Sequence, residues 1–193
     1  MPLPTFTRRS LLATPLLLAA CGKPVFNGVD LTGSSWGQSL SLPDTEGRLR
    51  SLADFRGKVL VLFFGYTQCP DVCPTTLSEL RAIKEQLGKA GEDVVPLFVT
   101  VDPERDTPQL LRDYMAVFGG VALRPGSAEE LQRVAREFKV VYQKVPGTVE
   151  GQYTMDHSAQ CLLFDRQGRL RVYSKYGTPT PALLADLKVL LDE

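Results

Sequence analysis

An apolar run that begins directly after Lys58 and ends at Phe64 predicts a strand over residues 58–64. Its length and its β-branched and aromatic content are typical of a strand buried on both faces, as in a parallel sheet. Beyond it, apolar residues recur at helical spacing and predict an amphipathic helix over residues 74–87. Pro74 fits the first turn of that helix, where a missing N–H group costs nothing. A buried strand followed by a helix is therefore the expected centre of the fold.

The same pattern predicts further elements along the chain. Capping residues mark two helix starts, with Thr107 before Pro108 and with Ser127 in a capping box. Alternating apolar and polar positions around glycine-containing turns predict two hairpins. The expected elements are strands over 94–101 and 140–145, helices over 107–118 and 127–138 and from residue 180 onward, a turn-rich loop over 146–151, and hairpins that join 38–42 to 48–52 and 159–164 to 170–174.

This order predicts an α/β fold. Strand, helix, strand and helix, followed by a hairpin and a last helix, is the order of the thioredoxin fold. Two additions are expected, an N-terminal hairpin and an insertion before the last hairpin. Residues 35–193 are the predicted extent of this domain.

Length and charge narrow the function classes. The chain has 193 residues, a hydrophobic content of 44% and a formal net charge of zero. That is enough for one globular domain with a substantial core and too little for two. Because the charges balance, the chain has no basic field for nucleic acid, which is excluded as a partner.

Residues 1–20 are typical of an export signal of the lipoprotein type. Arg8 and Arg9 give a positive start, and the apolar stretch that follows is too short to span a bilayer as a mature helix. Small residues lie directly before Cys21, an arrangement that resembles a bacterial lipobox and predicts lipid attachment at the Cys21 sulfur. The alternative is an ordinary secretory signal with an incidental cysteine. The paired arginines leave twin-arginine and general secretion open as routes.

Either route exports the domain. Residues 21–34 are the expected tether, and the lipid would anchor the protein to a membrane with the domain facing the periplasm or the cell exterior. An oxidising compartment permits disulfides, so Cys69 and Cys73 are expected to be oxidised to each other at times.

Cys69 and Cys73 lie between the end of the buried strand and the start of the helix. The partial positive charge of a helix N-terminus favours thiolate over thiol there. With three residues between them, the two sulfurs can hold one ion, and paired thiolates favour Cu(I) or Zn(II) over hard cations. Structural zinc needs four ligands, whereas the donors here amount to three, which favours copper. A plain disulfide or two unligated cysteines is the alternative.

His157 is the only histidine of the chain and the expected third ligand. It is expected in a loop before a central strand, at the end of the sheet where α/β proteins place their sites. Asp156 is the expected partner that orients the ring. By itself, a lone histidine is more often a solvated or hydrogen-bonded structural residue.

Other residues near these segments receive separate interpretations. Cys161 is expected to be a small buried apolar residue, because it lies four residues beyond His157 on a strand. Met155 is expected to pack in the core, with a weak thioether contact to copper as the alternative. Asp102 and Arg105 either shape the rim of the site or a partner surface, or form a plain turn.

Three segments resemble the Sco/SenC family of copper chaperones, in the order of the chain. The first two run from Phe64 to Leu77 and from Val99 to Pro108, and the third is Asp156-His157-Ser158. The resemblance covers about residues 35–192. It implies a thioredoxin-like domain that is anchored to a membrane, faces the periplasm or its equivalent and binds copper through Cys69, Cys73 and His157.

The resemblance further implies a role in maturing the dinuclear copper centre of cytochrome c oxidase, as copper donor, as thiol reductant, or as both. The expected partners are the copper-bearing subunit of the oxidase and an upstream periplasmic copper donor. The chain departs from the family in two respects: many members carry a transmembrane helix where this chain has Cys21, and Cys161 is not part of the pattern.

The expected chemistry is ligand exchange. Reduced Cys69 and Cys73 with neutral His157 form a three-coordinate Cu(I) site, with Cu(II) left open, and the low coordination number leaves room for a thiolate of the target. Oxidation of the two cysteines to a disulfide would abolish binding. A chaperone of this kind is not an enzyme. The rival interpretations are a thiol–disulfide oxidoreductase of thioredoxin type, and a peroxide-reducing or redox-sensing protein.

Overall fold

The structure is a computed structural model, and it describes residues 24–193. The expected signal peptide, Cys21 and the first part of the expected tether lie outside these residues. The strands are β1 (Val29–Asp30), β2 (Ser41–Pro43), β3 (Leu49–Ser51), β4 (Val59–Gly65), β5 (Val94–Thr100), β6 (Val121–Leu123), β7 (Tyr142–Pro146), β8 (Tyr153–His157), β9 (Cys161–Phe164) and β10 (Leu170–Ser174). The helices are η1 (Leu52–Phe55), α1 (Val72–Leu87), η2 (Gly88–Asp93), α2 (Pro108–Phe118), α3 (Ala128–Glu137) and α4 (Thr180–Asp192).

The main sheet has six strands in the order β1-β10-β9-β4-β5-β6. Strand β4 pairs in parallel with β5 and antiparallel with β9, and β9 pairs antiparallel with β10. This is the thioredoxin arrangement, so the predicted α/β fold is confirmed. The predicted insertion before the last hairpin comprises β6, α3, β7 and β8, and the predicted N-terminal hairpin is β2 with β3.

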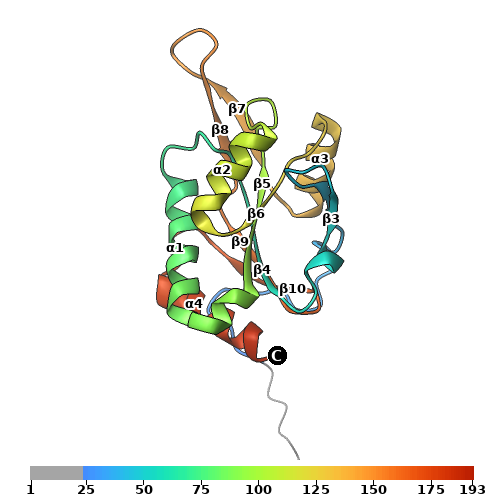
Figure 1. The fold of residues 1–193 in the computed structure, drawn as a ribbon, viewed down its shortest axis with the longest axis vertical. Helices are drawn as coiled ribbons and strands as arrows, with labels where there is room; N and C mark the ends of the chain where they lie inside the picture. Colours follow the sequence, from blue (N-terminus) through green and yellow to red (C-terminus); the bar gives the residue numbers. More distant parts are fainter. Residues whose placement is uncertain (1–23) are drawn as a thin grey trace, which may run out of the picture.

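Strand β4 is the centre of the core, because all seven of its residues are buried. Successive side chains of a strand point to opposite faces of a sheet, so one strand contributes to two hydrophobic layers. One face packs against α1, α2 and α4, and the other against α3 and the β2–β3 hairpin (Figure 1). The first face receives Val59, Val61 and Phe63, and the second receives Leu60, Leu62 and Phe64.

The sequence Asp-x-x-Gly-Arg closes both predicted hairpins, at residues 44–48 and 165–169. In each turn the aspartate accepts hydrogen bonds from the second and fourth backbone N–H groups after it and from the arginine Nε, at 2.8–3.1 Å. Gly47 and Gly168 have φ angles of 79° and 76°, a region that favours glycine. The turn chemistry read from the sequence therefore fixes the register of both hairpins.

The Asp165 turn predicts a pH dependence of stability. Burial alone would raise the pKa of Asp165, but hydrogen bonds from Arg169 and Arg171 outweigh it and hold the pKa below its ordinary value. A carboxylate whose pKa is depressed by folding stabilises the fold above its unfolded pKa, and that stabilisation is lost as the pH falls through the folded pKa. We therefore expect the free energy of unfolding of the wild type to fall as the pH drops below about 5. The Asp165→Asn variant should be less stable than the wild type at pH 7, and its free energy of unfolding should fall less at low pH.

Urea denaturation at pH 7, 5 and 3 measures the effect of Asp165→Asn. Asp192→Asn is the control, because Asp192 is exposed at the end of α4. Equal pH slopes for Asp165→Asn and the wild type would contradict the expectation.

The structure differs from the sequence-based expectations at three short strands. Strand β1 lies within residues 21–34, the expected tether, and pairs with β10 at the edge of the main sheet. Asp186 of α4 accepts hydrogen bonds from the backbone N–H groups of Asn27 and Gly28, which holds this segment in place. Strand β6 was not expected, because only three residues pair with β5. Strand β8 replaces the loop expected at His157.

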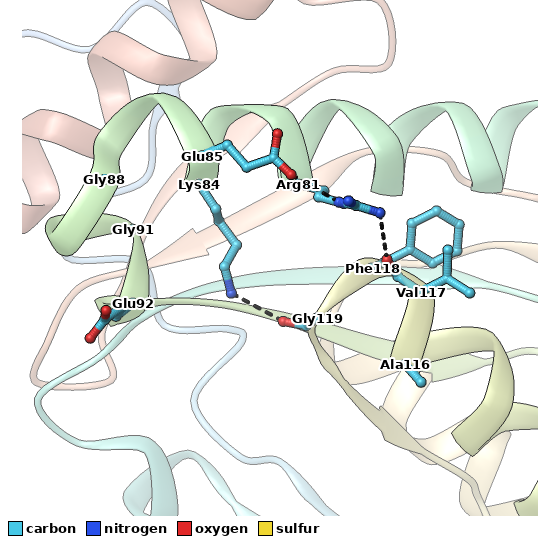
Figure 2. Close-up of a pocket in the computed structure, with 10 residues that line it drawn as sticks. All are labelled: Arg81, Lys84, Glu85, Gly88, Gly91, Glu92, Ala116, Val117, Phe118 and Gly119. Atoms are coloured by element: carbon cyan, nitrogen blue, oxygen red, sulfur yellow. Dashed lines mark hydrogen bonds and ion pairs between the residues drawn. The ribbon is translucent and has the colours of Figure 1, made fainter.

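Helices α1 and α2 are joined at their C-terminal ends by cations of α1 (Figure 2). Arg81 donates to the carbonyl of Val117 at 3.2 Å, and Lys84 donates to the carbonyl of Gly119 at 3.0 Å. Cations near the last carbonyls of a helix satisfy acceptors that have no partner within it. These residues line a pocket of about 590 Å³, in which Arg81 and Lys84 already donate hydrogen bonds to backbone carbonyls.

Within residues 24–193, no helix combines the length and the apolar character needed to cross a bilayer.

Candidate metal centre

The two cysteines come from the segment that joins β4 to α1. Cys73 lies in the first turn of α1 and is completely buried, whereas Cys69 in the preceding loop is partly exposed. The backbone N–H of Cys73 donates to the Sγ of Cys69 at 3.4 Å. One of the free N–H groups at the helix start is therefore directed at the Cys69 sulfur.

His157 reaches the cysteines from the insertion. It is the last residue of β8, and its Nε2 lies 3.5 Å from the Sγ of Cys73. The three potential ligand atoms of Cys69, Cys73 and His157 all lie within 4.8 Å of one another. Donors at bond lengths of 2.0–2.3 Å around one trigonal ion would be about 3.5–4 Å apart. The three side chains can therefore hold a single ion after small side-chain adjustments.

The imidazole ring of His157 is oriented by a backbone group. Its Nδ1 lies 3.0 Å from the carbonyl oxygen of Ser158, which fixes the proton on Nδ1 and leaves the lone pair of Nε2 facing the sulfurs. The side chain of Asp156, the expected orienting partner, is exposed, while Asp156 and His157 line the same pocket. The rings of Phe63 and Tyr66 contact the imidazole edge-on, with centroids 6.1 Å and 5.9 Å away.

Burial changes the protonation of the buried donors. It lowers the pKa of His157, so the imidazole is neutral and able to bind a metal at pH 7. It raises the pKa of the Cys73 thiol, despite the nearby helix start. In the metal-free protein, burial therefore works against the thiolate that the helix start favours at Cys73. A soft cation would have to displace the Cys73 proton on binding.

Cys161 and Met155 contribute two further sulfur atoms near the cluster, both on buried side chains. Cys161 is buried beside Phe63 in the main sheet, and burial raises the pKa of its thiol to about 12. The prediction that Cys161 is a small apolar core residue is confirmed. Met155 is also buried and lines the shallow pocket of about 370 Å³ at which Cys69 and His157 open to solvent.

Two residues that support the cysteines, Gly65 and Asp106, were not predicted as part of the site. A Cβ atom at Gly65 would lie only 2.7 Å from the Cys73 sulfur, so this glycine makes room for the thiol. Buried Asp106 accepts hydrogen bonds from the Thr67 hydroxyl at 2.6 Å and the Thr100 hydroxyl at 2.5 Å. It thereby ties the cysteine loop to the end of β5. A glycine at the end of a buried strand often marks a place where another group comes close, so the position of Gly65 in the sequence could have predicted this role.

Asp102 and Arg105 form a turn, in which the Arg105 N–H donates to the Asp102 carbonyl at 3.2 Å, and their side chains make further contacts. Both side chains leave the loop between β5 and α2 and contact Tyr153 of β8. One donor of Arg105, Nη2, is buried without an acceptor. A buried donor without a partner costs about 1–3 kcal/mol.

Comparison with known proteins gives consistent matches. The SCO1/SenC family model matches residues 30–192. An SCO2-like protein of Rickettsia typhi is 35% identical over 135 residues, which cover 69% of this chain and 66% of that relative, just under two thirds of its length. Copper-bound ScoI of Bradyrhizobium japonicum is 36% identical with a TM-score of 0.70, over 81% of this chain and 99% of that structure. Apo Sco1 of Thermus thermophilus is 38% identical with a TM-score of 0.73, over 86% and 97%.

Proposed function

Since the chain belongs to the SCO1/SenC family, we propose that it carries copper as a cargo bound to Cys69, Cys73 and His157. The observation that supports this most strongly is the convergence of two thiols and one neutral imidazole within 4.8 Å. Soft sulfur donors favour Cu(I), and three donors suit its low coordination number better than the four that structural zinc requires. The solved ScoI structure of Bradyrhizobium japonicum is described as having copper bound.

The proposed mechanism is transfer by ligand exchange. Cys73 is buried and Cys69 is partly exposed, so a partner approaches the ion from the Cys69 side. A thiolate of the partner enters the open coordination position, and bonds to this chain are then released one after another. Each cysteine regains a proton as its bond to the ion breaks. The ion is never free in solution at any stage.

We propose the copper-bearing subunit of cytochrome c oxidase as the recipient and an exported copper protein as the donor. This proposal, like export and a lipid anchor at Cys21, is supported by family membership and by the sequence of residues 1–21. Reduction of the oxidase cysteines by the same pair of thiols is compatible with this role.

The alternative function is thiol–disulfide exchange. The partly exposed Cys69 beside the buried Cys73 is also the arrangement of an attacking and a resolving thiol. The Cys69 thiolate would attack a partner disulfide and release one partner thiol, and Cys73 would then displace the second as the Cys69–Cys73 disulfide forms. This reaction oxidises the chain by two electrons and needs no histidine.

An anaerobic Cu(I) titration with a competing chelator tests the proposal, with turnover of a disulfide substrate measured on the same sample. We expect one tightly bound copper ion per reduced chain and no catalytic turnover. Turnover without stoichiometric copper would instead support the oxidoreductase.

Replacing His157 by alanine is expected to weaken Cu(I) binding without abolishing it. The two sulfurs would remain as a linear pair. We expect the affinity for Cu(I) to fall by at least about 10-fold, because loss of a group that only hydrogen-bonds to a metal ligand already costs about 10–100-fold. Met155→Leu is the matched control, because Met155 lies two residues earlier on β8 and in the same pocket. Wild-type affinity in His157→Ala would remove His157 from the ligand set, and weakened binding in Met155→Leu would make the thioether a ligand.

A further inference from the structure

The position of His157 depends on a hairpin that is separate from the main sheet. Within the described part of the chain, strands β7 and β8 pair only with each other and form a two-stranded sheet. In Figure 1 this hairpin projects beyond the body of the domain, beside the loop between β5 and α2. An isolated two-stranded hairpin is at best marginally stable in water. Side-chain contacts with the body must therefore fix where β8 lies.

Arg105 and Asp102 of the β5–α2 loop hold the first residue of β8 at three points. Arg105 Nη1 donates to the backbone carbonyl of Tyr153 at 2.9 Å, and the guanidinium carbon lies 3.5 Å from the centre of the Tyr153 ring. The Tyr153 hydroxyl donates to Asp102 Oδ1 at 2.9 Å. Arg105 Nε donates to Asp102 Oδ2 at 2.5 Å, so the two loop side chains also hold each other.

The same guanidinium reaches the loop that carries Cys69. Its Nη1 lies 3.1 Å from Oε1 of Gln68, directly before Cys69. The guanidinium carbon is 5.7 Å from the centre of the Tyr66 ring, which in turn contacts the imidazole of His157. One side chain therefore connects the segment that supplies the sulfurs with the segment that supplies the imidazole.

We infer that Arg105 is a positioning residue of the copper site: it holds β8 so that His157 meets the two sulfurs. This inference rests on the proposed copper function. Tyr153 and His157 are four residues apart on one strand, or roughly 13 Å, so Arg105 acts through β8 and does not touch the ion. The planar guanidinium holds its donors in a fixed fork and can lay its flat face on a ring, whereas an ammonium group is a compact point charge without such a fork.

A second contact between the same loop and the same hairpin supplies a control. Lys144 of β7 pairs with Glu104 at 2.7 Å, but the Glu104 and Lys144 side chains are 71% and 48% exposed. Exposed ion pairs contribute little to structure. Glu104→Gln therefore removes a charge next to Arg105 while the contacts of Arg105 and Asp102 with Tyr153 stay in place.

The test measures Cu(I) affinity for Arg105→Gln, Arg105→Lys and Glu104→Gln, each with and without His157→Ala. We expect Arg105→Gln to weaken binding at least about 10-fold, Arg105→Lys to restore little of it, and Glu104→Gln to match the wild type. In the His157→Ala background, Arg105→Gln should change the affinity by less than about twofold, because the residue it positions is gone. Unchanged affinity in Arg105→Gln, or an equal loss in both backgrounds, would overturn the inference.

Hydrogen exchange on the reduced, metal-free proteins tests the positioning independently of copper. We expect faster exchange of the β8 amides in Arg105→Gln than in Glu104→Gln or the wild type, with exchange in β4 unchanged. Equal exchange in β8 would overturn the inference. If the wild type binds no copper, or His157→Ala binds like the wild type, the proposed function fails instead, and the exchange data still report whether Arg105 holds β8.

Discussion

Replacing Cys73 by serine is expected to abolish tight copper binding. Cys73 is the completely buried donor of the cluster, and a serine hydroxyl in its place is a hard donor that stays protonated at neutral pH. Loss of a group that hydrogen-bonds to a metal ligand already lowers metal affinity by about 10–100-fold. We therefore expect loss of the ligand itself to lower it by more than about 100-fold. Copper content after desalting and the affinity from chelator competition measure the effect.

Cys161→Ser is the matched control for this substitution. Cys161 is also a buried free cysteine, on the same side of the main sheet, but it is not part of the three-residue cluster. Both substitutions bury a hydroxyl group, which costs about 1–3 kcal/mol where the hydroxyl finds no partner. Thermal unfolding should therefore show similar losses, while only Cys73→Ser loses copper. Equal copper binding by the two variants would contradict the assignment of Cys73.

Replacing Gly65 by alanine is expected to damage the fold and the metal centre together. The added Cβ would lie 2.7 Å from the Cys73 sulfur and 2.8 Å from Cε2 of Phe98, both in the core. Both neighbours are buried side chains, so overpacking should cost about 1–3 kcal/mol. Copper affinity should also fall, because the clash falls on the sulfur of a proposed ligand. Urea denaturation and the Cu(I) titration measure the two effects.

Gly126→Ala separates this clash from a general intolerance of glycine replacement. A Cβ at Gly126 would meet Glu130 Oε2 at 3.5 Å, which is an ordinary contact. We expect this variant to have the stability and copper affinity of the wild type. If Gly65→Ala were equally harmless, the sulfur of Cys73 would have more room than the structure gives it.

The helices, strands and turns that depend on residues close together in the chain could be predicted from the sequence. The apolar run of β4, the helical periodicity of α1 and the Asp-x-x-Gly-Arg turns each depend on residues that are neighbours in the chain, and each is found where it was predicted. Strand β8 was missed, although Tyr153, Met155 and His157 alternate with polar positions. Among the described strands it pairs only with β7, so its existence depends on a pairing across the hairpin.

Residue type and spacing were enough to predict the fold class, the placement of two cysteines at a helix start and the choice of a soft metal. The folded chain decided that His157 meets Cys73, 84 positions away, and that the carbonyl of Ser158 accepts a hydrogen bond from its ring. It also decided that Cys73 is a buried thiol for which Gly65 makes room. The burial of a side chain and its contacts with distant segments depend on how the whole chain packs. A short stretch of sequence therefore does not predict them.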